Sequence, residues 1–191
     1  MKKSAFFLSM INTDLIKFLM PDGSLMKFED YQKQNKLSGA QIAHNFYYTE
    51  PKFTQDIQDY KELIVCHKLM RVLDTYRNLK NAPININSFN RSESKQKQLQ
   101  KDGFKAAKTS PHVVKLAADC DTLTEKETLE NVKMVQEAAK ITDIKVRIGY
   151  QEYLNAGQTF IHIDVCPEYY AKGRIWYLKP HPIQWEREIT W

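Results

Sequence analysis

The chain has 191 residues, of which 42% are hydrophobic and 27% are charged, and its formal net charge at pH 7 is +5. A chain of this size and composition buries one good core, so we expect one main domain with an extra segment and not two full domains. It contains no run of about 18 apolar residues, which excludes a helix that spans a membrane. The excess of lysine suits an anionic partner such as nucleic acid, a cell-wall polymer or a membrane surface, but it is equally typical of a solvated face.

The first residues and the cysteines indicate the cellular compartment in which the protein is expected. Met1–Ile11 has two lysines and a short apolar run, but the run breaks at Asn12 with no small-x-small cleavage site behind it, so we predict no signal peptide. The three cysteines, Cys66, Cys120 and Cys166, are odd in number and form no Cys-x-x-Cys pair. This pattern favours a reducing compartment and argues against a disulfide scaffold or a thiolate zinc site.

Short elements and one long helix are predicted in the first eighty residues. A turn at Pro21–Gly23 separates Leu15–Met20 from Leu25–Tyr31, which we interpret as short strands or helical turns. A long helix is predicted from an N-cap at Thr54 to Asn81–Pro83, because apolar side chains recur at three- and four-residue spacing along it. Its end is predicted there because the residue before a proline disfavours helical backbone.

A strand and a polar loop are predicted next. Pro83–Phe89 alternates apolar and polar residues as a strand does, and it runs into Arg91 and Ser92. Residues 93 to 109 are rich in Lys, Gln and Ser, and we interpret them as a mobile polar loop. Their lysines could attract an anionic wall polymer. Because Phe104 is their single aromatic residue and nucleic acid is bound by stacking on aromatic rings, we do not expect nucleic acid as the partner.

The second half of the chain contains two strands with a polar face. Asp119 shares one face of a predicted strand with Ala117 and Asp121, and His162 and Asp164 share one face of the strand Phe160–Val165. The other face of each strand is apolar, so the polar face should line a cleft.

The remaining elements of this half surround those two strands. A capping box beginning at Thr124 predicts a helix, in which Glu127 reaches back to the amide of the cap residue. Asp143–Tyr150 is predicted as a strand, and a hairpin-like connection leads from it to the strand of His162. One more strand is predicted at Arg174–Leu178.

Three polar side chains could meet at one point. His112 lies in a loop just before the strand of Asp119, and His162 lies on the other polar strand. Two histidines and a carboxylate are the ligands that a catalytic zinc ion uses when its fourth position is left for water. A single histidine on a strand is more often a packed structural residue, so the composition of this group does not by itself establish a metal site.

The spacing of these residues resembles that of a known family. The stretch Ser110-x-His112-x6-Asp119, followed by a strand with His-x-Asp, is similar to the signature of the zinc D-Ala-D-Ala carboxypeptidases and L-Ala-D-Glu endopeptidases. These peptidoglycan metallopeptidases share a fold with the hedgehog signalling domain. Their pattern is roughly Ser-x-His-x-x-Gly-x-Ala-x-Asp. Ala117 fits it, and Lys115 stands in the place of the glycine.

A second segment carries the same resemblance. The family has a strand that ends in Ser, followed by Arg-Ser, and Ser88, Arg91 and Ser92 match it. The resemblance implies that Arg91 holds the carboxylate of the substrate, to which a guanidinium can donate two parallel hydrogen bonds. The alternative is a surface arginine at the start of a loop. Ser110, in the first motif, is also expected to contact the substrate.

The resemblance implies an α+β fold with a central antiparallel sheet, helices packed on one face and zinc on the open face. It covers roughly residues 41–180, the expected zinc peptidase-like domain. Residues 1–40 are then an N-terminal extension packed on that domain, and residues 181–191 are a C-terminal tail. His112, Asp119 and His162 are the expected zinc ligands. The expected activity is hydrolysis of peptidoglycan stem peptides by a monomeric metallopeptidase.

The general base is where this chain departs from the family. The family places a glutamate three residues before the last zinc histidine or a histidine two residues before it, whereas Thr159 and Phe160 occupy these positions here. Asp164 and Glu152 are the remaining candidates, and Asp164 could equally orient a zinc ligand.

Two alternatives follow from this departure and from the expected absence of a signal peptide. A catalytically inactive, zinc-stabilised module that binds cell-wall polymer or a protein partner remains open. For an active enzyme, we expect a phage or prophage endolysin that stays in the cytoplasm until another protein releases it to the cell wall.

Overall fold

A computed structural model describes residues 11–102, 110–169 and 188–190. The strand predicted at 174–178 lies outside the described residues, as do residues 1–10. In chain order the elements are η1 (Thr13–Leu15), β1 (Ile16–Leu19), β2 (Leu25–Lys27), α2 (Phe28–Asn35), β3 (Gln41–Ala43), β4 (Phe46–Tyr47), α3 (Pro51–Tyr60), β5 (Leu63–Cys66), α4 (His67–Lys80), β6 (Ile86–Ser88), α5 (Glu93–Lys101), β7 (Ala117–Asp121), α6 (Glu125–Thr142), β8 (Val146–Gly149), α7 (Gln151–Asn155), β9 (Phe160–Asp164), α8 (Cys166–Tyr169) and β10 (Glu188–Thr190).

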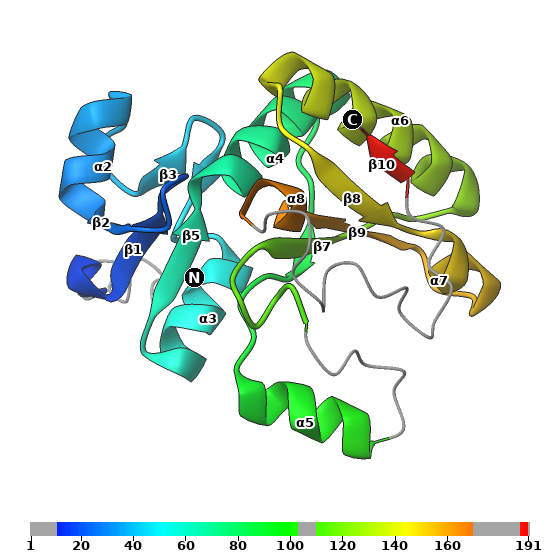
Figure 1. Ribbon diagram of the computed structural model, residues 1–191, viewed down its shortest axis with the longest axis horizontal. Coiled ribbons are helices and arrows are strands. Elements are labelled where there is room, and N and C mark those ends of the chain that lie inside the picture. Colours follow the sequence, from blue (N-terminus) through cyan, green and yellow to red (C-terminus); the bar gives the residue numbers. More distant parts are fainter. Residues whose placement is uncertain (1–10, 103–109, 170–187, 191) are drawn as a thin grey trace, which may run out of the picture.

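A five-stranded sheet forms the centre of the fold. Its strand order is β10-β8-β9-β7-β6, and every neighbouring pair is antiparallel. The helix α6 packs on β8 and β9, and α4 packs on α6 (Figure 1). Both predicted strands with a polar face are confirmed: the strand of Asp119 is β7, and the strand predicted at Phe160–Val165 is β9, which ends one residue earlier. The arrangement agrees with the α+β class predicted from the sequence.

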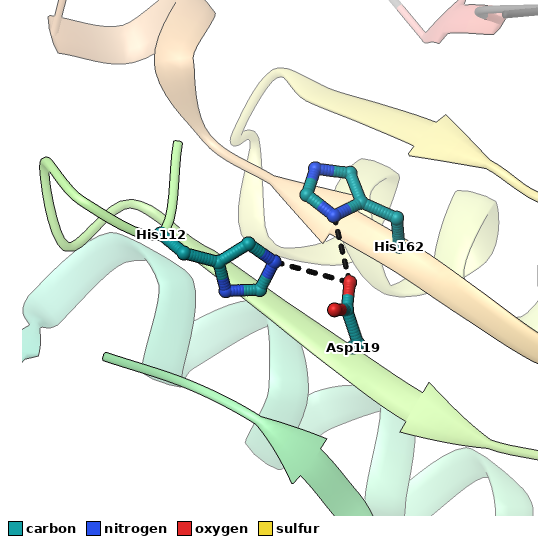
Figure 2. Close-up of side chains that lie close together, drawn as sticks. All are labelled: His112, Asp119 and His162. Atoms are coloured by element: carbon teal, nitrogen blue, oxygen red, sulfur yellow. Dashed lines mark hydrogen bonds and ion pairs between the residues drawn. The ribbon is translucent and has the colours of Figure 1, made fainter. Parts of the chain in front are cut away.

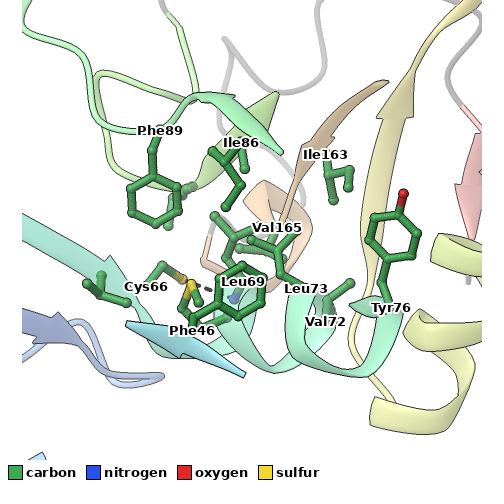
Figure 3. Packing of buried hydrophobic residues seen from close by; sticks show 14 of the residues in the cluster. Phe46, Cys66, Leu69, Val72, Leu73, Tyr76, Ile86, Phe89, Ile163 and Val165 are labelled. Atoms are coloured by element: carbon green, nitrogen blue, oxygen red, sulfur yellow. Dashed lines mark hydrogen bonds between the residues drawn. The ribbon is translucent and has the colours of Figure 1, made fainter. Parts of the chain in front are cut away.

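The core lies between this sheet and α4. The buried stripe of α4 includes Leu69, Val72, Leu73 and Tyr76, and it faces the apolar side of the strands (Figure 3). Each large apolar side chain removed from water in this way contributes about 2 kcal/mol. Because period-2 alternation sends the apolar side chains of β9 into this core, His162 and Asp164 lie on the opposite face.

A second sheet joins the N-terminal residues to the rest of the molecule. Its strand order is β2-β1-β5, and β1 pairs with β5 in parallel, with Phe18 beside Val65. The segments 15–20 and 25–31, for which strands or helical turns were both predicted, contain β1, β2 and the start of α2. Phe18 and Tyr31 are buried in the same cluster as the α4 stripe.

The prediction of one long helix over residues 54–81 is wrong. The structure has α3, then β5, then α4 in this segment. Lys61 ends α3 in the left-handed conformation, with φ of 55°. The run Leu63–Cys66 then forms an edge strand that pairs with β1 along its whole length, which suits its β-branched residues. The Sγ atom of Cys66 accepts a hydrogen bond from the Leu69 amide at 3.5 Å and so starts α4.

The predicted polar loop is also partly wrong, because its first half is the helix α5. The Ser92 hydroxyl accepts a hydrogen bond from the Lys95 amide at 3.1 Å, which caps the helix. Glu93 in the first turn and Lys101 in the last complement the helix dipole. A helix can therefore form here with a single buried residue, Gln96. Residues 103–109 lie outside the described part of the chain.

Two smaller differences concern α6 and α7. Thr124 caps α6 as predicted, but the Glu127 carboxylate accepts from the amide of Leu123, one residue before the cap, at 2.7 Å. The connection from β8 to β9 contains the one-turn helix α7 and is not a simple hairpin. Within the described residues, no helix has the length and apolar character needed to cross a membrane.

Candidate metal centre

The register of the sheet brings Asp119 and His162 together. Asp119 of β7 lies directly opposite His162 of β9, and both side chains are on the face away from the core. Ser88 of β6 is opposite Asp119 on its other side, and Gly149 of β8 is opposite His162. These four residues form one row across the sheet, so the side chains of Asp119 and His162 must meet.

A tight turn before β7 adds His112 to this row. The turn is closed by hydrogen bonds from the Val113 amide to the Ser110 carbonyl at 3.0 Å and from the Leu116 amide to the Pro111 carbonyl at 2.9 Å. The buried hydroxyl of Ser110 accepts from the His112 amide at 3.3 Å, so it shapes the turn.

Lys115 completes the turn in the left-handed region. Its φ is 65°, a conformation that favours glycine. This is the position where the family pattern has glycine. The lysine ammonium donates to the Arg91 carbonyl at 3.1 Å. Burial lowers the pKa of this ammonium, while Glu62 and Asp56 oppose that shift.

The three predicted ligand residues lie in contact (Figure 2). One carboxylate oxygen of Asp119 is 3.1 Å from Nε2 of His112 and 2.8 Å from Nδ1 of His162. One potential ligand atom from each residue lies within 4.8 Å of the other two, and all three residues are buried. The group could hold a metal ion.

The second nitrogen of each imidazole has a fixed partner. Nδ1 of His112 is 2.8 Å from the Phe89 carbonyl oxygen, which can only accept, so Nδ1 carries the proton. Nε2 of His162 is 3.2 Å from a carboxylate oxygen of Asp164 and donates to it. The lone pairs of the neutral rings are then on Nε2 of His112 and Nδ1 of His162, the two atoms that face Asp119. Metal-binding histidines in proteins are oriented in this way, so the residues fit a divalent metal ion.

Asp164 is held by more donors than His162 alone. Nε of Arg147 is 2.9 Å and 3.0 Å from its two oxygens, and the Cys166 amide donates to it at 3.0 Å. Burial disfavours the charge of Asp164, but Arg147 and His162 outweigh it and hold the pKa of the carboxyl well below its usual range. Asp164 is therefore an ionised acceptor whose oxygens are already engaged.

The surroundings of the two histidines shift their pKa values in opposite directions. Burial lowers the pKa of His112, even though Asp119 opposes the shift. Burial acts in the same direction on His162, but hydrogen bonds with Asp119 and Asp164 outweigh it and raise its pKa to about 9. The pKa of Asp119 is lowered despite burial, because both histidines stabilise its charged form.

Arg91 lies at the edge of the cluster. Its guanidinium donates to the Ser88 hydroxyl at 3.0 Å and to the side-chain oxygen of Gln96, in α5, at 2.8 Å. One of its nitrogens is 3.8 Å from Asp119. The guanidinium is thus fixed beside the candidate ligands by two neutral partners.

Glu152, the other candidate base, is in the first turn of α7 and is half-buried. The helix begins two residues after Gly149, the residue opposite His162. This topology places the start of α7 at the end of β8 that is next to His162.

Sequence reasoning missed two groups that support the cluster. Arg147 is buried and pairs with Asp164, and its signal was present, since it lies between the buried Val146 and Ile148 and must face the polar side of the sheet. The Phe89 carbonyl could not have been found, because a backbone acceptor leaves no signal in the side-chain pattern.

Comparisons with known proteins give little beyond this geometry. No protein-family model matches the chain, and no curated protein matches it in sequence. A similar solved structure is the crystal structure of the L-Ala D-Glu endopeptidase ChiX of Serratia marcescens, at 18% sequence identity. The similarity covers 53% of this chain and 80% of that chain, with a TM-score of 0.46. It is a partial similarity of the backbone.

Proposed function

We propose that the protein is a zinc-dependent peptidase that hydrolyses peptidoglycan stem peptides, of the D-Ala-D-Ala carboxypeptidase or L-Ala-D-Glu endopeptidase type. The observation that carries the proposal is the meeting of His112, Asp119 and His162, with the two ring lone pairs directed to one point. Three such ligands are the set that leaves one zinc position for water. The substrate class, and the hedgehog-like arrangement of residues 41–180, rest on the resemblance of the motifs.

The residues around the cluster have separate roles in this mechanism. Zinc bound at the cluster would supply Lewis acidity, which activates water and polarises the scissile carbonyl. The guanidinium of Arg91 binds the carboxylate of the substrate through the N–H groups that its protein partners leave free. Ser110 serves the mechanism through the shape of the turn that presents His112.

We assign the general base to Glu152. A base must take a proton from the attacking water and pass it to the leaving amine. Asp164 is a poor candidate because Arg147, the Cys166 amide and His162 already donate to it. Asp164 instead orients His162, and Glu152, in the helix that follows β8, is then the remaining candidate.

The absence of the family's usual base residues favours a second, non-catalytic function. Thr159 and Phe160 stand where the family has its general base, so the protein is, alternatively, an inactive zinc-stabilised module that binds cell-wall polymer or a protein partner. If the protein is an active peptidase, we propose that it is a monomeric endolysin, which stays in the cytoplasm until it is released to the cell wall.

Digestion of purified peptidoglycan separates the two functions. The zinc-loaded protein should release peptide fragments that mass spectrometry identifies, and a chelator should stop the release. Full zinc occupancy without any release would favour the binding module. A His162→Ala protein that still holds one zinc ion per chain would contradict the ligand assignment.

The assignment of the base has its own test. Glu152→Gln should lower the rate of peptide release by about 100-fold or more while zinc content stays unchanged. Glu137→Gln, on the exposed face of α6, is the matched control and should cleave like the wild type. Equal rates for the Glu152→Gln and wild-type proteins would remove Glu152 from the mechanism.

A further inference from the structure

A buried carboxylate in α3 has no part in the mechanism described above. Asp56 has 0% exposed surface, and it lies on the inward side of α3 with Phe53 and Ile57. One of its oxygens is 2.8 Å from the ammonium of Lys52, one turn earlier in the same helix. Burying a carboxylate is costly, so its second oxygen should have an equally definite partner.

That partner is a backbone amide beside the candidate metal centre. The second oxygen of Asp56 accepts from the Asn90 amide at 2.9 Å. The side chain of Asn90 is buried, and neither its oxygen nor its nitrogen has a hydrogen-bond partner among the described residues. The contact with Asp56 therefore fixes the backbone of this residue and not its side chain.

The same peptide group contacts a candidate metal ligand. The Asn90 N–H and the Phe89 C=O belong to one planar peptide group, so an orientation imposed on the N–H is imposed on the C=O. The Phe89 oxygen accepts the Nδ1 proton of His112 at 2.8 Å. A continuous chain of hydrogen bonds thus leads from Asp56, through one peptide group, to the ring whose Nε2 faces Asp119.

Aromatic packing also joins α3 to the peptide group in the middle of this chain. The Phe53 ring meets the Phe89 ring edge-on, with 5.0 Å between centroids. The helix α3 therefore contacts the Phe89–Asn90 segment twice, through this aromatic pair and through the hydrogen bond to Asp56. Hydrogen bonds in such a chain polarise one another, and a carboxylate at the N–H end makes the carbonyl a stronger acceptor. The stronger acceptor makes the distal ring nitrogen a better metal ligand.

We propose that Asp56 is a positioning residue for the metal centre, and that it orients and polarises the peptide group to which His112 donates. The inference rests on the proposed metal-binding role of His112, but not on the peptidase activity. It gives α3, which contributes no ligand, a defined effect on metal affinity.

The test compares two carboxylate-to-amide variants of the full-length protein. Asp56→Asn keeps an oxygen that can accept from the Asn90 amide, but removes the charge. Asp74→Asn is the matched control, because Asp74 also accepts from a backbone amide, that of Asn45 at 2.8 Å, which is not next to a candidate ligand. Zinc affinity is measured by competition with a chelating dye, and the Nδ1–H signal of His112 is followed by NMR of the zinc-loaded, 15N-histidine-labelled protein.

The two variants should differ in a way that a purely structural role would not produce. Asp56→Asn should weaken zinc binding by about 3- to 10-fold and shift the His112 Nδ1–H signal, since groups behind metal ligands typically alter affinity on this scale. Asp74→Asn should leave both quantities at wild-type values. Wild-type zinc affinity and an unshifted signal in Asp56→Asn would overturn the proposal, even if the variant were less stable.

A measurement on the wild type keeps the proposal testable if Asp56→Asn does not fold. Addition of zinc should shift the amide signal of Asn90 and leave that of Asn45 unchanged; an unaffected Asn90 signal would overturn the proposal. A wild-type protein that binds zinc but cleaves no peptidoglycan peptide would refute the proposed function alone. A protein that binds no zinc would refute both.

Discussion

At the scale of single residues, the cluster is a row of alternating charges in a buried setting. Arg147, Asp164, His162 and Asp119 follow one another at hydrogen-bonding distance. A carboxylate on each side of His162 favours the imidazolium form in the metal-free protein. Neutral His162 is the form that would hold a divalent ion, so such an ion would compete with that proton.

The metal-free protein should therefore lose stability as the pH rises. The pKa of His162 is raised to about 9 in the folded protein from an ordinary value of 6.5. A raised pKa stabilises the folded state fully below the unfolded-state value, and this stabilisation is lost as the pH rises through the folded-state value. Urea unfolding of the metal-free protein should give a free energy that falls between about pH 6.5 and 9.

A His162→Asn protein provides the comparison for this pH profile. It has no titrating ring at this position, so the fall over the same pH range should be reduced. A wild-type profile that is flat, or that rises over this range, would contradict the raised pKa. For the zinc-loaded protein the sign is reversed, since neutral imidazole binds the ion and affinity should increase with pH.

Lys115 also makes a prediction at the residue scale. Its φ of 65° is strained for any residue with a Cβ, while its ammonium compensates by bonding the Arg91 carbonyl. Lys115→Ala keeps the strain and loses the bond, whereas Lys115→Gly loses the bond but relieves the strain. Denaturant unfolding should find the glycine variant more stable than the alanine variant by about 1 kcal/mol. The opposite order would mean that the turn is not left-handed in solution.

At the scale of elements, the sequence predicts best where side chains alternate strictly. The polar faces of β7 and β9 were correctly predicted, because each strand has one apolar face on the core. Since these two strands carry Asp119 and His162, the ligand group could be anticipated before any register was known. Asp56 could not, because an acidic residue on a helix with polar neighbours looks like part of a solvated face.

Prediction from the sequence fails where three successive elements share one hydrophobic periodicity. The apolar residues of α3, β5 and α4 also fit a single helical stripe, and no proline or glycine separates them. The expected helix is interrupted by Lys61, which has the left-handed conformation, and by the pairing of β5 with β1, about fifty residues away in sequence. A long-range pairing of this kind overrides local pattern.

The cap of α6 gives a prediction for one element. The Thr124 hydroxyl accepts from the Glu127 amide at 3.1 Å, so Thr124→Ala should lower the free energy of unfolding by about 1 kcal/mol. Lys126→Ala, at a side chain that is 87% exposed in the same first turn, is the control and should change it little. Chemical denaturation of both variants measures the difference, and equal stabilities would show that the cap contributes nothing.

At the scale of the whole molecule, residues 11–40 are integrated with the rest of the described chain by a shared sheet and a shared core. The parallel pair β1–β5 joins this segment to the strand that leads directly into α4. Ile16, Phe18, Phe28 and Tyr31 are all buried in the common cluster. The N-terminal segment, expected to be an extension, therefore covers part of the core that the remaining chain would otherwise expose.

A truncated protein of residues 41–191 should not fold on its own. Each of the four side chains contributes about 2 kcal/mol of burial, and together they rival the total stability of about 5–15 kcal/mol that a domain has. Circular dichroism and size-exclusion chromatography of the truncated protein should show loss of fixed structure or aggregation. A soluble, cooperatively unfolding fragment that binds zinc like the full-length chain would establish 41–191 as an independent domain.

His112 faces Asp119 with Nε2, the ring nitrogen farther from the backbone, whereas His162 faces Asp119 with Nδ1, the ring nitrogen nearer to it. The shorter reach belongs to the histidine on β9, and the longer reach belongs to the histidine in the turn before β7. Glutamine matches the reach of Nε2 and asparagine that of Nδ1. Dialysis against zinc should leave more metal in His112→Gln and His162→Asn than in His112→Asn and His162→Gln. Equal metal content in the two pairs would show that reach does not govern the site.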